Sequence, residues 1–201
     1  MNREANVLAP GFLIASPPLG DPNFDRTVVL LAVHSEGGAL GFVVNRPAPM
    51  TLGELLSFAG YGNELKHPGP VYLGGPVQPS SGWILCLDPE LGAEETGVIP
   101  VGARVRVTSS RSAFDALAAD AARGAVGAAS ADPRRRTVLL GYSGWGPGQL
   151  EREIASGAWL PTPLDERVLF DVAADQRWEQ AYALLGLSPI EVMSMRSIGE
   201  A

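Results

Sequence analysis

The sequence predicts an α+β fold with a mixed or antiparallel sheet, and three observations carry this prediction. Strand-like runs fill most of the first half, and helices alternate with strands only later. The regular strand–helix rhythm of a doubly wound sheet is absent. The 24 Gly and 17 Pro among 201 residues indicate many turns and short elements rather than a helical bundle. Because many strands are short, we expect the sheet to curl.

The first strands form a predicted hairpin. Residues 12–16 favour an extended conformation, and the run RTVVLLAV at 26–33 is β-branched and nearly all apolar. Such a run is typical of a strand buried on both faces. The sequence SEGG at 35–38 predicts a tight turn, because glycines permit positive φ. Residues 39–45, ALGFVVN, are the expected hairpin partner.

A short helix and two more strands follow. Thr51 and Glu54 have the spacing of a capping box, apolar residues then recur at helical spacing, and Gly60 ends the helix. The runs PVYLGGPV and GWILCLD predict two strands, separated by a turn from Gly74 to Gly82. The next strand alternates, with valines expected inward and Arg104 and Arg106 outward.

The second half alternates helices and strands. Ser109 or Ser110 is expected to cap a helix that ends at Gly124. A buried strand, RTVLLGY, leads into a glycine-rich turn and a helix over Gln149–Ser156. The proline-containing run WLPTPL and the run VLF predict short edge-type strands. A last main helix ends at Gly186, and Ser188-Pro189 starts a short final one.

Composition and charge narrow the class of protein. The length suits one domain over 1–201 with a sizeable core. A net charge of −7 and a pI of about 4.8 disfavour a broad phosphate-binding surface, so direct nucleic-acid binding is not expected. The basic run Arg134–Arg136 is interpreted as a solvated strand entry.

No signal peptide or membrane span is apparent, which favours a cytoplasmic protein. The single cysteine, Cys86, excludes an internal disulfide and a cysteine-based zinc cluster, and its apolar run favours burial.

The segment LLGYSGWGPGQLEREI at 139–154 invites two catalytic interpretations. Its residues 141–144 start like a G-x-S-x-G nucleophile elbow around Ser143, but the fifth motif position holds Trp145 instead of glycine. Both histidines, His34 and His67, precede the serine. A P-loop is excluded because Pro147 and Gly148 replace its Lys and Ser/Thr. An anion could still bind at a helix starting with Pro147. A tight strand-to-helix turn anchored by Trp145 is the favoured interpretation.

Other polar turns carry weaker signals. The turn containing Gly74, Gly75 and Gln78 could line a polar pocket, although a bare hairpin or bulge is the commoner explanation. The sequence GDPNFD at 20–25 lacks the ligands of a calcium loop and is better explained by an Asx-turn. No HExxH or CxxC pattern is present, so no metal site is assigned.

Several segments, in this order, give the chain a specific resemblance. They are FLIASPPLGDPNFDRTVVLL, GALGFVVNRP, TLGELL, VYLGGPVQPSSGWIL, LLGYSGWGPGQLEREIASGAWL and VLFDVAADQRWEQAYALLGL. With them the chain resembles the YqgE/AlgH family of bacterial proteins. The resemblance implies an α+β fold in which a mixed, largely antiparallel bent sheet forms a pseudo-barrel with surrounding helices. It implies no catalytic residue and no cofactor, and members are often labelled transcriptional regulators.

The leading hypothesis is a non-enzymatic cytoplasmic protein that binds a partner protein or a small ligand. The surface would be built by four turns, NFDRT, NRP, GGPVQ and GYSGWGPGQ. Its candidate residues are Asn23, Asp25, Arg26, Asn45, Arg46, Gly74, Gly75, Gln78, Tyr142, Ser143, Gly144, Trp145, Gly146 and Gln149. One alternative is a hydrolase that uses Ser143 or a carboxylate such as Asp25. A second is a transcriptional regulator, with direct DNA binding disfavoured by the acidic pI.

Overall fold

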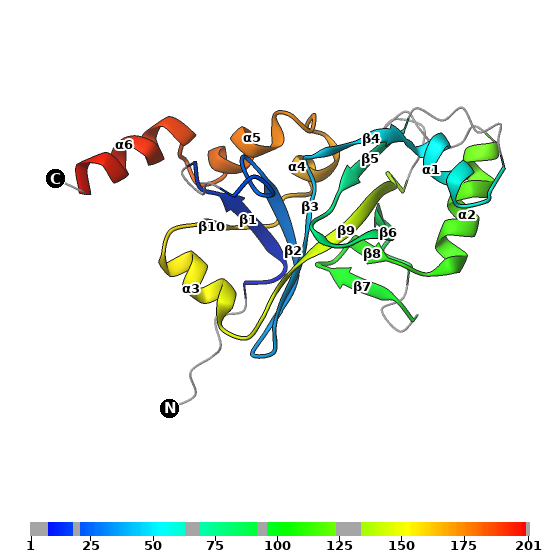
Figure 1. Ribbon diagram of the computed structural model, residues 1–201, viewed down its shortest axis with the longest axis horizontal. Coiled ribbons are helices and arrows are strands. Elements are labelled where there is room, and N and C mark those ends of the chain that lie inside the picture. Colours follow the sequence, from blue (N-terminus) through cyan, green and yellow to red (C-terminus); the bar gives the residue numbers. More distant parts are fainter. Residues whose placement is uncertain (1–7, 18–20, 63–68, 92–95, 124–133, 200–201) are drawn as a thin grey trace.

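A computed structural model describes residues 8–17, 21–62, 69–91, 96–123 and 134–199 (Figure 1). Within these ranges the chain forms one ten-stranded sheet and six helices. All strand pairs are antiparallel except the pair of β5 and β9, which is parallel. The sheet curls, and helices pack around it (Figure 1). The predicted fold class is therefore confirmed.

The main path of the sheet has the strand order β10-β1-β2-β3-β9-β6-β8-β7. The strands of the first half are β1 Gly11–Ala15, β2 Val28–Ser35, β3 Gly38–Val43, β4 Pro47–Thr51, β5 Pro70–Leu73 and β6 Val77–Leu87. The later strands are β7 Val98–Val101, β8 Val105–Thr108, β9 Thr137–Trp145 and β10 Trp159–Pro163. The strands β2 and β3 form the expected hairpin, in which Ser35 pairs with Gly38.

Strand β9 joins the two halves of the sheet. One of its edges pairs with β5 through residues 138–140 and then with β3 through residues 143–145. Its other edge pairs with β6. Gly141 lies at the change of partner and has a φ of 70°, a conformation that suits glycine. The sheet thus bends within the glycine-rich motif.

The strands β1 to β3 are buried on both faces, as predicted for β2. Side chains alternate between the faces, following the two-residue period of a strand. One face packs against α4 and α5 through Phe12, Ile14, Val28, Leu30 and Phe42. The opposite face packs around α3 through Leu13, Ala15, Val29, Leu31 and Val43. Cys86 is buried in a third cluster, formed with α1 and α2.

The helices α1, α2 and α6 begin where their sequences indicate. Their bounds are α1 Leu52–Phe58, α2 Arg111–Ala122, α3 Gln149–Ala155, α4 Glu166–Phe170, α5 Arg177–Ala183 and α6 Pro189–Gly199. Thr51 and Glu54 form the predicted capping box on α1, and Ser110 caps α2. The predicted end of α2 at Gly124 lies outside the described residues. The helix α6 begins at the predicted Pro189 and projects from the body of the molecule (Figure 1).

Four local predictions are wrong. The turn expected from Gly74 to Gly82 ends before Val77, because β6 begins there and pairs with β9 across an irregular register. The run VLF belongs to α4, whose cap is Asp165. The helix α3 starts after Gly148, so Pro147 is not its first residue.

The fourth error concerns Arg106, which is buried rather than directed outward. Its guanidinium donates to five backbone carbonyls, among them Val105 O at 2.8 Å and Leu91 O at 3.0 Å. A guanidinium carries enough donors to satisfy several carbonyls at once. Arg106 therefore holds the loops around β8 together, while Arg104 is exposed as predicted.

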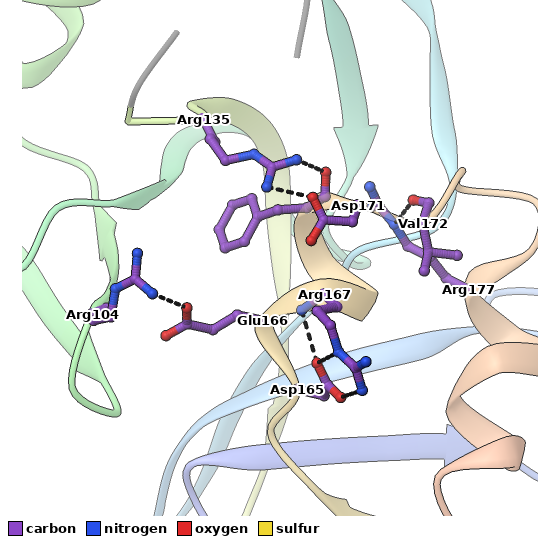
Figure 2. Close-up of polar contacts among 9 residues, drawn as sticks. Arg104, Arg135, Asp165, Glu166, Arg167, Asp171, Val172 and Arg177 are labelled. Carbon is purple, nitrogen blue, oxygen red and sulfur yellow. Dashed lines mark hydrogen bonds and ion pairs between the residues drawn. The ribbon is translucent and has the colours of Figure 1, made fainter. Parts of the chain in front are cut away.

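Charged side chains fasten α4 to the rest of the molecule (Figure 2). Arg104, from the β7–β8 turn, pairs with Glu166 at 3.1 Å, and Arg135 pairs with Asp171 at 2.6 Å. On α5, Arg177 is buried and donates to Val172 O at 3.0 Å. Burial lowers the pKa of the Arg177 guanidinium. Both ends of α4 are thus held by arginines from outside the helix.

Candidate functional site

The first two of the four candidate turns are joined by hydrogen bonds. The Arg46 guanidinium donates to the carbonyls of Pro22, Asn23 and Asp25, at 3.1, 2.7 and 3.3 Å. The Asn45 amide donates to Arg26 O and accepts from the backbone N–H of Val28, both at 2.8 Å. These side chains hold the backbone of the neighbouring turn, which is a structural role.

The third turn packs directly on β9. A Cβ atom at Gly74 would lie 2.4 Å from Gly141 O, and one at Gly75 would lie 2.3 Å from the Tyr142 carbonyl carbon. The backbone N–H of Gly74 donates to Leu140 O at 2.7 Å. Only glycine permits this approach, so the two glycines serve contact between backbones rather than a ligand.

Ser143 is not placed to act as a nucleophile. Its side chain is buried, and its hydroxyl donates to Gly74 O at 3.4 Å. The ring of His34 accepts from Leu8 N–H at 3.2 Å through Nδ1 and contacts Glu151 Oε1 at 3.0 Å through Nε2. The backbone N–H of Glu151, together with His34, lowers the pKa of the Glu151 carboxyl. His67 lies outside the described residues. Among the described residues, no histidine or carboxylate is hydrogen-bonded to Ser143.

A cavity of about 380 Å³ opens beside the close-packed glycines. The last turn contributes Gly144, Trp145 and Gln149 to its wall. The other lining residues come from the first turn region, the third turn, α3 and the start of β10: Asp21, Phe24, Pro76, Val77, Glu153, Ala158 and Trp159. Three of the four turns thus meet at one concave site, and its volume lies in the range of small-molecule pockets.

Glu153 is the central polar residue of this cavity. Its Oε2 accepts hydrogen bonds from the indole N–H groups of Trp145 and Trp159, each at 2.8 Å. Its Oε1 accepts from the Gln149 amide, also at 2.8 Å. Gln149 in turn accepts from the backbone N–H of Gly146 at 3.1 Å. One carboxylate therefore fixes both indoles and the turn before α3.

Aromatic rings pack around this carboxylate. Trp145 and Trp159 meet edge to face with their ring centroids 5.9 Å apart. Phe24 contacts Trp159 in the same way at 5.3 Å. Such pairs fix the ring orientations and stabilise beyond simple burial. Both indoles are buried, whereas Phe24 and Glu153 are half-buried. The site is therefore a preformed aromatic cavity with a carboxylate on its wall.

Comparison with known proteins identifies the family. The model of the AlgH-like family matches residues 12–190. The chain belongs to the AlgH-like family. A UPF0301 protein of Anaeromyxobacter sp. (strain Fw109-5) is 46% identical over 191 residues, covering 90% of each chain. A UPF0301 protein of Nitrosococcus oceani is 40% identical over 178 residues, covering 88% of each.

Solved structures show the same fold. The solution structure of the AlgH protein from Pseudomonas aeruginosa matches with a TM-score of 0.73 and 34% identity, covering 94% of each chain. A crystal structure from Corynebacterium diphtheriae matches with a TM-score of 0.64 and 20% identity, covering 90% of this chain and 88% of that one. The second likeness concerns the fold alone.

Most of the sequence-predicted site residues are not on the cavity wall of this AlgH-like chain. Gly144, Trp145 and Gln149 line it. Tyr142 packs edge to face against Trp83 in the main core, with centroids 6.3 Å apart. Gln78 is exposed, and its carbonyl accepts from the Ser81 hydroxyl.

Glu153 and Trp159 are the important residues that sequence reasoning did not select. The spacing of Gln149 and Glu153 is i, i+4, which places both on one face of α3. That spacing, together with Trp145 just before the helix, was the available signal. No sequence rule indicates that Trp159, on another strand, meets the same carboxylate.

Other site classes find no support in the described part of this AlgH-like protein. Each arginine of the basic run pairs with an aspartate: Arg134 with Asp88, Arg135 with Asp171 and Arg136 with Asp120. No group of three or more potential metal ligands gathers among the described residues. None of the helices in the described ranges combines the length and apolar character that crossing a bilayer requires.

Proposed function

We propose that this AlgH-like protein is a non-enzymatic cytoplasmic binding protein, and that the cavity around Glu153 receives its ligand or a side chain of its partner protein. The observation that carries the proposal is the meeting of three polar turns at one preformed cavity of about 380 Å³. Concave, aromatic-lined sites with a few placed polar groups are typical of ligand binding.

The contacts of the neighbouring residues support binding over hydrolysis. The hydroxyl of Ser143 is buried against Gly74 O. Asp25 is exposed. A hydrolase of this design needs a base within hydrogen-bond reach of its nucleophile. The polar residue on the cavity wall, Glu153, instead holds two indoles in place, as expected of a residue that shapes a binding site.

Direct contact with nucleic acid is disfavoured by charge. A phosphate-binding surface needs cations that are free to release counterions on binding. The basic run at 134–136 lies opposite aspartates in all three of its positions, and the whole chain carries a net charge of −7. Any regulatory role would therefore act through a partner protein or a small ligand.

A fragment screen by NMR tests this proposal. The full chain, labelled with ¹⁵N, would be titrated with a panel of cationic, anionic and neutral fragments. Binding fragments should shift the amide signals of Val77, Gly144 and Gln149 more than those of residues distant from the cavity. Shifts concentrated elsewhere, or no binding by any fragment, would contradict the proposal.

A matched pair of glycine variants sharpens the test. Gly144 lines the cavity, and a Cβ there would meet only the Tyr142 ring at 3.7 Å, an ordinary contact. Gly146 is also exposed, and a Cβ there would meet only Gln149 Oε1 at 3.9 Å, but Gly146 is not on the cavity wall. Gly144→Leu should block fragment binding, whereas Gly146→Leu should preserve it. Equal binding by both variants would place the ligand outside the cavity.

A further inference from the structure

The charges on the cavity wall have one sign. Two carboxylates, Asp21 and Glu153, line the cavity, and no lysine, arginine or histidine does. In the described part of the chain, neither carboxylate takes part in an ion pair. The three hydrogen bonds to the Glu153 carboxylate come from neutral groups, two indoles and an amide. Its negative charge is stabilised there but not neutralised.

The partial burial of Glu153 makes its charge favour a cationic ligand over an anionic or neutral one. A carboxylate beside buried aromatic rings is in a lower effective dielectric than one at the open surface, which strengthens its attraction to a cation. Glu153 is half-buried, next to two indoles whose exposed fractions are 6% for Trp145 and 2% for Trp159. An anionic ligand would meet repulsion from both carboxylates, and a neutral ligand would gain only apolar contact. A cation would supply the missing charge.

The aromatic residues favour an organic cation over a bare metal ion. Alkylated ammonium groups bind to tryptophan and phenylalanine through cation–π attraction and apolar contact together. A divalent metal ion prefers several oxygen ligands, whereas Oε2 of Glu153 is already occupied by two indole N–H groups. The cavity is also far larger than the space of one water-sized ion. A bulky ammonium group with an alkyl stem matches its size, polarity and charge.

We infer that the cavity binds an alkylammonium group, with Glu153 as its counter-ion and Trp145, Trp159 and Phe24 as its aromatic surround. This inference rests on the proposed binding function and specifies its ligand class. The same group can belong to a free amine or to a lysine side chain of a partner protein. Asp21, at another part of the wall, adds a second negative charge that favours cations over anions.

Two matched ligand pairs test the inference. Choline and 3,3-dimethyl-1-butanol have almost the same shape but differ in charge, and so do Nα-acetyl-lysine methylamide and Nα-acetyl-norleucine methylamide. Calorimetry with the full chain at low salt should show binding of a cation and at least about tenfold weaker binding of its neutral counterpart. Added salt should weaken the binding of the cation and leave the binding of its neutral counterpart unchanged. Choline binding points to a free amine, and binding of the lysine derivative points to a partner protein.

Two variants assign the effect to the carboxylates. Glu153→Gln keeps an oxygen that accepts from the indoles and should weaken cation binding about tenfold, with little change for the neutral isostere. Asp21→Asn does not touch the indole pair, so it tests the charge even where Glu153→Gln loosens the site. Asp21→Asn should weaken cation binding by a smaller factor than Glu153→Gln does.

The outcomes separate the inference from the binding function beneath it. Equal binding of a cation and its isostere, sensitive to Gly144→Leu, would overturn the charge inference and leave the cavity as a binding site. Cation binding that survives both carboxylate variants would also overturn it. Absence of binding by both cations would overturn it as well, and a neutral or anionic fragment that binds in the screen would still support the proposed function.

Discussion

Replacing Gly75 by alanine should test whether the glycine-rich motifs exist for close backbone packing. Gly75 has a φ of 153° in the turn between β5 and β6. An added Cβ would lie 2.3 Å from the carbonyl carbon of Tyr142 and 2.4 Å from Ser143 Oγ. Because the first of these contacts is with backbone, a change of rotamer cannot relieve the overlap. The turn must move away from β9.

The expected loss of stability has two parts. Holding a non-glycine residue in this region of φ costs about 1–3 kcal/mol. Moving the turn also weakens the hydrogen bonds from Gly74 N to Leu140 O and from Val43 N to Gly74 O, both 2.7 Å long. At about 1 kcal/mol for each net hydrogen bond, these add about 2 kcal/mol. We expect the free energy of unfolding to fall by about 3–5 kcal/mol, a large share of the total for most domains.

Gly60→Ala supplies the matched control. Gly60 also has a positive φ, 86°, but a Cβ there would meet nothing within 4 Å. This variant should lose only the conformational preference of glycine, about 1–2 kcal/mol. Both variants would be unfolded in urea and followed by circular dichroism. If Gly75→Ala lost no more stability than Gly60→Ala, the contact between the turn and β9 would not be the reason for the glycine.

Three further substitutions have defined outcomes. Arg106→Lys should lower the free energy of unfolding by about 3 kcal/mol in urea, because a lysine cannot satisfy the carbonyls that the guanidinium serves, and an unchanged midpoint would contradict this. Hydrogen bonds from Thr51 hold the pKa of the Glu54 carboxyl below its ordinary value of 4.5. The stabilisation by the Glu54 charge is therefore full above pH 4.5 and is lost as the pH falls through the lowered pKa. Stability curves of the wild-type chain and Glu54→Gln should converge in acid, and a constant difference would count against the capping box. Ser143→Ala should cost about 1 kcal/mol or less and leave fragment binding unchanged, whereas loss of binding would give its hydroxyl a direct role.

The sequence predicts best where structure is decided locally. The capping box of Thr51 and Glu54 involves residues three apart, and the cap at Ser110 likewise depends on its own helix. The burial of β2 on both faces could be predicted because nearly all of its residues are apolar. These signals require no knowledge of what packs against the segment.

Predictions failed where distant segments decide the outcome. The residues after Val77 contain proline and serines, typical of a turn, yet they belong to β6, which pairs with β9 at Val77 and again from Gly82. Arg106 was expected outward because its neighbours alternate, but carbonyls of two other loops surround its guanidinium. The same limit applies to the cavity, since Phe24 and Val77 join Trp159 on its wall from distant parts of the chain.

The arrangement also explains why the most distinctive motif of the chain gives little sign of its chemistry. Where Gly74 and Gly75 meet Gly141, the backbones are too close for any ligand to enter. The cavity opens beside this contact, where Val77 on β6 and Trp145 at the end of β9 contribute side chains to its wall. The glycines thus allow the third turn to pack directly on β9, next to the cavity. The chemical character of the site comes from residues that are unremarkable in the sequence, above all Glu153. In such a chain the better indication of function lies beside the glycine-rich motif, at the carboxylate that accepts hydrogen bonds from two indole N–H groups.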